Sequence, residues 1–577
     1  MSRRDIRFAT PKMPREQQVL FPQRLDEVVD EDAPVRTLVS LLEGVDWSPW
    51  EERYAGVGQP AIHPRYLAGA ILWGLLHRMR SSRILERASR KDLDFIWLLE
   101  GFTPDHSTFA NFRTAHGEAI KALQAHFAKS LLERREQALL CLILDGTRLR
   151  ADSGRQGARK AETIEYIIGE LQRRMDVLKQ GDEEAEEAAR TDYIEGLAPP
   201  EAEQPASSNP EIARLEKKLA KYHKALEIAR ERDAKARKHN GKNAKPARVP
   251  VTDPESQILP NKEGGYAPNY TPAAGVDVET GAIVYADVVE GSQEASAVLP
   301  AVVAAEELTG QPANAVLADG NFAAGPVLDA LDQRGTAAYM PTRSASPPDN
   351  PAQRPDPSVP VAEEDRGHLP RTGQQLDRSA FIYDAEANVY YCPMGNVLRP
   401  HKRGTNKEGA SYTEYQCADC AGCPLFEACV KGKKKTARGI VRDEHEPLRE
   451  AMNERMATPE GQALYRQRAP GIEGVFGHIK ANMGIRRFNV RGLNKVRTAW
   501  NWVCTAYNLK KLLDLAAKSA SGGPASTKCP QTTAIQHWID HTLLLRATRH
   551  PVTPRRAMSQ IHTTGRRRQH EYIATVA

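Results

Sequence analysis

The chain has 577 residues, of which 40% are hydrophobic and 27% charged. Such a composition is typical of a soluble protein, and at roughly 150 residues per domain the length predicts about three or four units. The apolar runs AGAILWGLL and ALLCLIL fall well short of the roughly 20 residues that span a bilayer, and the N-terminus has no apolar signal-peptide segment. We therefore expect no membrane partner and a cytoplasmic location.

The positive charge is unevenly distributed along the chain. Residues 431–577 hold 27 Lys and Arg against 10 Asp and Glu, although the net charge of the whole chain is only +6. A basic region of this kind favours a polyanionic partner such as DNA. A solvated surface followed by a basic tail explains the same counts without any partner.

Helical spacing begins after a polar N-terminal arm, residues 1–35. The apolar residues Leu67, Ile71, Leu72, Leu75 and Leu76 recur at the helical period, and residues 36–135 are predicted to form an all-α N-terminal domain. Polar residues at its helix junctions suggest a helix-turn-helix-like DNA reader, with DNA contacts predicted for Arg83, His106 and Arg113. A plain helical support domain accounts for the pattern nearly as well.

Residues 136–515 have the pattern of an α/β catalytic domain with two insertions. The strand-like runs LCLILD and NAVLAD, a hairpin around Thr280-Gly281 and intervening helices predict a mixed β-sheet flanked by helices. A charged helical hairpin is predicted over 156–250, and a loop followed by a cysteine-rich insertion over 342–445. The stretch from Ser344 to about Leu376 is predicted to be a flexible loop. Residues 516–577 form a weakly patterned basic tail, for which disorder is one interpretation.

Three acidic residues are candidates for a metal centre. Asp145 and Asp319 each end an apolar strand run and precede a glycine, and Glu473 lies in a helix predicted to start at Pro470-Gly471. Two-metal phosphoryl chemistry needs carboxylates from separate elements, so the combination predicts bound Mg²⁺ or Mn²⁺. Each Asp alone would more often initiate a turn, and Glu473 alone could be an ordinary first-turn carboxylate. Glu454 and Glu460 are weaker candidates than Glu473 for the third carboxylate of the metal centre.

Basic residues surround Glu473 in the sequence. Lys480 lies two helical turns after it, on the same predicted face, and is expected to join the catalytic group. DNA phosphates are predicted to contact Tyr465, Arg468, Arg486, Arg487 and Arg491.

Five of the eight cysteines cluster ahead of that helix: Cys392, Cys417, Cys420, Cys423 and Cys429. In a chain expected to be cytoplasmic this spacing favours a metal over disulfides, and four of the five thiolates would suit a structural Zn²⁺. An iron–sulfur cluster and reduced, unliganded thiols remain alternatives.

Several segments together resemble the DDE (Asp-Asp-Glu) transposases of bacterial insertion sequences. They are LILDGTRLRA, TDPES at 252–256, VLADGNF at 316–322, and YRQRAPGIEGVFGHIKANMGIRRFNVRGLNKV at 465–496. The resemblance spans about residues 36 to 515 and implies a ribonuclease H-like fold for the catalytic domain. It also implies that Asp145, Asp319 and Glu473 form the metal-binding triad.

The resemblance extends to further residues and segments. Tyr465, Arg468, Glu473 and Lys480 are similar to the Tyr-Arg-Glu-Lys signature of many such enzymes, although four residues separate Arg468 from Glu473 where the commonest form has three. HPRYLAGAILWGLLHRMRSSRILE and PDHSTFANFR resemble the family's N-terminal domain, which is thought to bind the terminal repeats of the element. Some members carry a similar cysteine-rich insertion.

The resemblance implies a transposase that cuts DNA with a metal-activated water and joins the freed 3′-OH to a target strand. Its partners would be double-stranded DNA, both transposon ends and target, and a second copy of the chain in a homodimer or larger assembly. A tyrosine recombinase fits the acidic triad less well. Two alternatives remain: a non-catalytic, zinc-containing DNA-binding protein derived from a transposase, and a nuclease without strand transfer.

Overall fold

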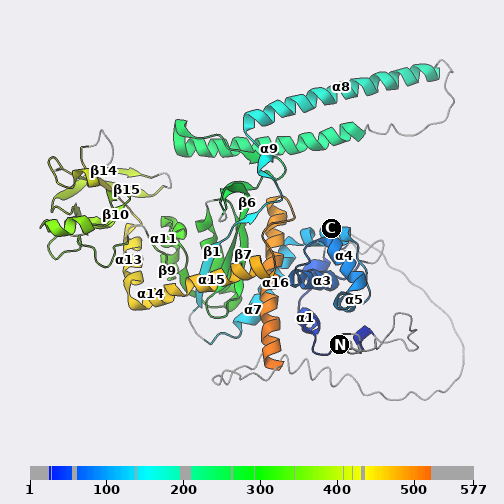
Figure 1. The fold of residues 1–577 in the computed structure, drawn as a ribbon, viewed down its shortest axis with the longest axis horizontal. Coiled ribbons are helices and arrows are strands. Elements are labelled where there is room, and N and C mark those ends of the chain that lie inside the picture. Colours follow the sequence, from blue (N-terminus) through cyan, green and yellow to red (C-terminus); the bar gives the residue numbers. More distant parts are fainter. Residues whose placement is uncertain are drawn as a thin grey trace, which may run out of the picture. The chain divides into compact units, whose positions relative to one another are not determined.

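A computed structural model (Figure 1) describes residues 25–27, 29–52, 54, 61–136, 140–194, 210–261, 264–291, 293–342, 345–406, 409–418, 420–430 and 436–520. Residues 1–24 of the predicted arm and residues 521–577 of the predicted tail therefore lie outside the described residues. Among the helices in these ranges, none combines the length and apolarity that crossing a bilayer requires.

Helices make up the described chain as far as residue 136. They are η1 (Leu25–Glu27), α1 (Pro34–Glu43), α2 (Ser48–Glu51), α3 (Pro64–Leu76), α4 (Ser82–Lys91), α5 (Leu93–Leu98), α6 (His106–Ala115) and α7 (Gly117–Leu132). Pro64 occupies the first position of α3, where its missing N–H costs nothing. Asp105 accepts the Thr108 N–H at 2.7 Å and caps α6. Four residues of the predicted apolar stripe of α3, Leu67, Ile71, Leu72 and Leu75, are buried in the core, and Leu76 is half-buried against it.

A mixed sheet forms the centre of the next part of the chain. Its strands are β1 (Leu140–Gly146), β2 (Leu149–Arg150), β5 (Gln257–Pro260), β6 (Tyr266–Asp277), β7 (Ile283–Val289), β8 (Ala313–Leu317) and β9 (Ala337–Tyr339). Hydrogen-bonded neighbours follow the order β7-β6-β1-β8-β9, and β2 and β5 also pair with β6. β6 is antiparallel to β1 and β7, whereas β1, β8 and β9 are parallel. The hairpin predicted around Thr280-Gly281 is confirmed, and Gly281 has the positive φ of 65° that its turn requires.

Helices from distant parts of the sequence pack on this sheet. They are η4 (Glu294–Ala297), α10 (Val298–Thr309), η5 (Gly320–Phe322), α11 (Gly325–Gln333), α15 (Arg468–Gly477), the π-helical turn η8 (His478–Asn482) and α16 (Leu493–Ala520). α16 packs against β7, α7 and α3. Trp500 of α16 donates to the Ala273 carbonyl of β6 at 2.9 Å, and Trp502 packs against Trp50 and Phe112. The helix α16 thus joins the sheet to the helical part, residues 36–135.

The predicted helical hairpin is present as α8 (Ala161–Ile194) and α9 (Pro210–Asn240), which lie side by side in Figure 1. The short elements η2 (Arg155–Gly157), β3 (Ala158–Arg159), η3 (Gly241–Asn243) and β4 (Val249–Pro250) connect it to the sheet. Leu226 of α9 is buried with Ile164 and Ile168 of α8, and Leu219 and Tyr222 pack on this cluster. The apolar face of α9 therefore packs against α8.

The cysteine-rich insertion has a small core of its own. Its elements are η6 (Glu363–His368), β10 (Arg371–Thr372), β11 (Gln375–Leu376), η7 (Arg378–Ala380), β12 (Ile382–Asp384), β13 (Val389–Tyr391), β14 (Val397–Thr405), β15 (Ser411–Cys417), α12 (Phe426–Cys429) and β16 (Gly439–Asp443). β12 to β16 form an antiparallel sheet in chain order. Ala352, Val361 and Leu369 are buried in this core. The expectation of a flexible loop up to Leu376 is therefore wrong for residues 345–376, because apolar side chains between the prolines anchor the segment.

Two helices, α13 (Glu446–Ala457) and α14 (Pro459–Arg466), lead from the insertion back to α15. α15 begins at Arg468, two residues before the predicted start at Pro470-Gly471, so Glu473 lies inside the helix and not in its first turn. Ile472, Val475, Phe476 and Ile479 are buried and hold α15 and η8 against the core.

Gly471 sets how closely α15 approaches the sheet. A Cβ at this position would lie 2.3 Å from the terminal methyl of Ile143, a buried residue of β1 with little room to move. We expect Gly471→Ala to lower the melting temperature, because overpacking a core costs about 1–3 kcal/mol. Gly474→Ala is the matched control in the same helix: its Cβ meets nothing within 4 Å, and it should stabilise the helix by up to ~1 kcal/mol. Thermal unfolding of both variants tests this, and equal shifts of the same sign would contradict it.

Candidate active site

Asp145 and Asp319 lie at the ends of neighbouring parallel strands. Leu142 pairs with Val316 and Ile143 with Leu317, and continuing this register by two residues places Asp145 opposite Asp319. Asp145 Oδ1 accepts the Gly146 N–H at 2.7 Å, and Asp319 Oδ1 accepts the Asn321 N–H at 2.8 Å. The strand-end positions predicted for both aspartates are confirmed, and the sheet brings the two residues together.

Tyr465 and Arg468 come to the same place from α14 and α15. Arg468 Nη2 is 3.0 Å from Asp145 Oδ2, and the two side chains are 15% and 22% exposed. The Tyr465 hydroxyl lies 3.4 Å from the carbonyl oxygen of Ala318, the residue before Asp319. Burial raises the pKa of Tyr465, so the phenol stays protonated at neutral pH. A guanidinium and a phenol therefore face the two aspartates.

Lys480 is bonded to a residue near Asp145, whereas Glu473 is exposed to solvent. Lys480, in η8, donates to Thr147 Oγ1, two residues beyond Asp145. Glu473 is exposed, and its carboxylate has no hydrogen-bond or ion-pair partner among the described residues. In the part of the chain that the structure describes, no three His, Cys, Asp or Glu side chains are arranged to hold a metal ion.

A further carboxylate, Glu294, reaches the same edge of the sheet and was missed from the sequence. A Cβ on Gly146 would lie 3.1 Å from Glu294 Oε1, so this carboxylate sits against the residue that follows Asp145. Burial raises the pKa of Glu294, and the charges of Asp319 and Asp145 raise it further. Topology explains the convergence: β7 runs parallel to β1, so the segment after β7 starts at the same edge. In the sequence, the only signal was that Glu294 follows a predicted strand within a few residues. The direction of that strand in the sheet was unknown, so the sequence did not show at which edge Glu294 lies.

The predicted basic residues after Glu473 lie along β2. Arg487 and Arg491 both pair with Asp152, at 2.7 and 2.9 Å. The Arg486 carbonyl accepts the Arg150 N–H at 3.2 Å, and all three arginines are exposed. Asp145 pairs with Ala274 of β6 and Arg150 with Asn269 of the same strand, so this basic strip lies farther along β6 than Asp145.

The TDPES segment caps α16 instead of joining the carboxylates. Asp253 is 1% exposed and accepts hydrogen bonds from the Tyr270 hydroxyl at 2.7 Å and the Gly492 N–H at 3.1 Å. Glu255 accepts the Leu493 N–H at the first residue of α16. Burial raises the pKa of Asp253. The segment therefore fixes the helix that joins the sheet to the helical part.

In the helical part, Arg83 and His106 line one hollow of about 530 Å³ on the surface of α4, together with Glu86, Arg87, Arg90 and Lys91. Glu86 accepts from the His106 backbone N–H at 3.2 Å and pairs with Arg90 at 3.2 Å. Arg113 is not in this hollow. Its Nη1 donates to the Arg80 carbonyl at 2.6 Å, and burial lowers its pKa. The structure thus brings two of the three predicted DNA-contacting residues together.

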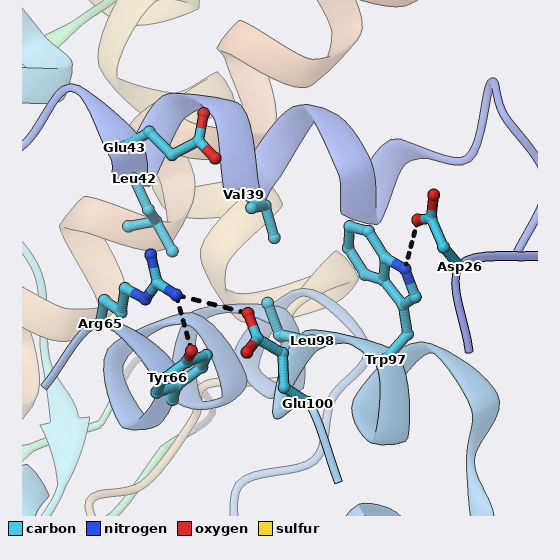
Figure 2. Close-up of a pocket in the computed structure, with 9 residues that line it drawn as sticks. All are labelled: Asp26, Val39, Leu42, Glu43, Arg65, Tyr66, Trp97, Leu98 and Glu100. Carbon is cyan, nitrogen blue, oxygen red and sulfur yellow. Dashed lines mark hydrogen bonds and ion pairs between the residues drawn. The ribbon is translucent and has the colours of Figure 1, made fainter. Parts of the chain in front are cut away.

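A second cavity of the helical part, of about 290 Å³, contains none of the predicted site residues (Figure 2). Val39, Leu42 and Leu98 form its apolar wall. Arg65 lies over the ring of Tyr66 and pairs with Glu100 at 3.3 Å, while Trp97 donates to Asp26 at 3.1 Å. Figure 2 shows these bonds joining Arg65 to Tyr66 and Glu100, and Trp97 to Asp26.

All five clustered cysteines line one small cavity in the insertion, of about 20 Å³. The Met394 N–H donates to Cys392 Sγ at 3.3 Å. A hydrogen bond with Cys417 and those of the nearby backbone lower the pKa of Cys392 to about 6, whereas burial raises the pKa of Cys429 to about 12. The predicted thiols thus share a site whose volume would admit one ion or one water.

Two transposase families match parts of the chain. The family described as "Transposase DDE domain" matches residues 391–513, and the one described as "Transposase domain (DUF772)" matches residues 23–115. A comparison with curated proteins finds no match. The resemblance to insertion-sequence DDE transposases is confirmed by these two matches, which indicate a transposition function and an enzymatic activity on DNA. The DDE match includes Glu473 and the five clustered cysteines but not Asp145 or Asp319. The assignment of the two aspartates therefore rests on their positions in the sheet.

Because Glu294 lies beside two aspartates, removing its charge should stabilise the chain when no cation is present. Its pKa is raised above the ordinary 4.5, so its ionised form costs stability at neutral pH, and this cost disappears as pH falls below 4.5. We expect Glu294→Gln to raise the melting temperature at pH 7 in EDTA by roughly 1–3 °C, with the gain vanishing near pH 4. Glu307→Gln, an exposed carboxylate of α10, is the control and should change little. A pH-independent gain would contradict the electrostatic cause.

Proposed function

We propose that the chain is a transposase that cuts and joins DNA through Asp145, Asp319 and Glu473, on a catalytic domain of the ribonuclease H-like kind. The observation that carries this is the meeting of Asp145 and Asp319 at adjacent parallel strand ends, faced by Arg468 from the helix that bears Glu473. The mixed order β7-β6-β1-β8-β9 supports the fold. The helical part, residues 36–135, would bind the ends of the element.

The donor set suits a hard divalent cation. Carboxylate oxygens are the ligands that Mg²⁺ and Mn²⁺ prefer, and Glu294 adds negative charge at the edge where Asp145 and Asp319 meet. Asp145 and Asp319 would hold the cations, with Glu473 completing the ligands. When bound, the cations supply activation of the attacking oxygen and charge compensation at the leaving oxygen.

Three side chains of this site would position the scissile phosphate. The Arg468 Nε–H is buried and has no hydrogen-bond partner among the described residues, which leaves a donor for a phosphate oxygen. Tyr465 stays protonated and can donate as well. Lys480, held near Thr147, brings a positive charge close to Asp145.

Double-stranded DNA would follow two basic surfaces. The hollow on α4 with Arg83 and His106 would engage the transposon ends, and the strip of Arg486, Arg487 and Arg491 would hold the DNA backbone. Because transposition acts on two ends and a target, we propose that a homodimer or larger assembly forms on DNA.

We further propose that four of the five clustered thiolates bind a structural Zn²⁺. The support is that all five line one small cavity within a separate core. Zinc would supply folding energy there and no catalysis.

The central prediction concerns Glu473. The assay measures cleavage and joining of DNA carrying the flanking ends of the element, with Mg²⁺ or Mn²⁺. We expect Glu473→Gln to bind this DNA normally but to lose both reactions by at least about 100-fold, because it removes a ligand charge from the cations. Asp145→Asn and Asp319→Asn should behave alike.

Glu454→Gln and Glu460→Gln are matched controls, since both carboxylates are exposed on the helices just before α15. Both should retain activity. Equal activity of wild type and Glu473→Gln would show that the third carboxylate is misassigned. Binding without cutting by the wild type, under all metal conditions, would favour a DNA-binding protein, and cutting without joined products a nuclease.

The zinc prediction is independent of DNA. Protein purified without chelator should contain about one zinc per chain, released when the thiols are modified. The double variant Cys417→Ser, Cys420→Ser should lack it and unfold at a lower temperature, whereas Cys504→Ala, a buried thiol of α16, should keep it. Elemental analysis decides: iron would indicate a cluster, and no metal would indicate free thiols.

A further inference from the structure

The loop between α3 and α4 reaches the end of the helix segment that carries the proposed catalytic residues. Arg78 Nε donates to the carbonyl oxygen of Asn482 at 2.6 Å, and Arg78 Nη2 to that of Ala481 at 3.1 Å. Both carbonyls belong to η8, which continues α15 and contains Lys480. An arginine of the helical part therefore closes the C-terminal end of the helix on which Glu473 lies.

The remaining carbonyl groups at this helix end find donors nearby. The Met483 N–H donates to His478 and the Ile485 N–H to Ile479, each at 3.0 Å, and Arg486 Nε lies 3.5 Å from the Lys480 carbonyl. The last carbonyls of a helix have no partners within it, so Arg78 satisfies the two that are left. Its positive charge also suits the negative end of the helix dipole.

The backbone of Arg78 is held in an unfavourable conformation. Its φ is 61°, in the left-handed region that residues with a Cβ rarely adopt. Neighbouring bonds fix the loop: the Met79 N–H donates to the Gly74 carbonyl at 2.7 Å, and Arg113 donates to the Arg80 carbonyl at 2.6 Å. Strain of this kind persists where the surroundings determine it, and it is common at functional sites.

Only residues 79–81 separate Arg78 from α4, the helix with the basic hollow. We propose that Arg78 is a positioning residue that couples DNA binding at α4 to the placement of the helix bearing Glu473 and Lys480. The catalytic meaning of this coupling rests on the proposed function. The cap itself and its response to DNA do not, because both can be measured without any reaction.

Hydrogen–deuterium exchange of residues 478–485 reads the cap directly. We expect Arg78→Ala to speed exchange there by about tenfold to a hundredfold, since hydrogen bonds from a charged donor are among the stronger ones. Arg78→Lys keeps the charge and should restore part of the protection. A duplex carrying the flanking ends of the element should slow exchange of 478–485 in the wild type but not in Arg78→Ala.

Two further measurements separate positioning from binding. Arg78→Ala should bind the duplex within about twofold of wild type, whereas its single-turnover cleavage at saturating DNA should fall about tenfold or more. Arg87→Ala, on the exposed face of α4, should show the opposite pattern, with weaker duplex binding and unchanged exchange of 478–485 in the absence of DNA.

Each outcome bears on a different statement. Unchanged exchange in Arg78→Ala would overturn the cap, and a wild-type helix end that does not respond to the duplex would overturn the coupling. Faster exchange with normal cleavage would overturn the positioning role. If the wild type cuts no DNA, the proposed function fails, while the exchange results still decide whether Arg78 links α4 to this helix.

Discussion

The pairing of β1 with β8 imposes the main constraint on this protein, because it sets two carboxylates side by side at one edge of the sheet. Like charges in such a place repel one another strongly unless positive charge compensates them. Arg468 compensates Asp145 at 3.0 Å, and it can do so only because α15 packs closely on β1. The lack of a side chain at Gly471 permits that approach, because a Cβ there would lie 2.3 Å from Ile143. The same repulsion acts on Glu294, because the charges of Asp319 and Asp145 add to burial in raising its pKa.

The long helix α16 gives the carboxylates and the helical part a common frame. Trp500 bonds to the sheet, Trp502 packs against Trp50 of the helical part, and Asp253 holds the turn at Gly492 from which the helix starts. These contacts are largely buried. The proposed DNA-binding surface on α4 and the proposed reaction at Asp145 would therefore share one support, with Arg78 as an additional connection.

The cysteine-rich insertion leaves and rejoins the sheet domain beside Asp319. A Cβ on Gly320 would lie 2.5 Å from the Pro341 carbonyl, where the chain departs, and a Cβ on Gly325 would lie 2.6 Å from His445 Nδ1, where it returns. With both ends fixed at one place, a long excursion costs little more closure entropy than a short one. The insertion has its own core of cysteines and aromatic residues, so it can be accommodated without disturbing the edge that carries the aspartates.

The sequence by itself determined the local features: the strands ending at Asp145 and Asp319, the hairpin at Gly281, the charged helical pair and the clustering of the five cysteines. Apolar periodicity and turn residues act over a few residues, so they can be read without knowing the fold. Only the tertiary structure decided that Glu294 joins the aspartates, that Arg113 supports a loop, that residues 345–376 pack into a core, and that Arg78 caps a helix about 400 residues away. The position of Glu294 depends on strand direction, and the others depend on contacts between segments that are distant in the sequence; no local pattern encodes either.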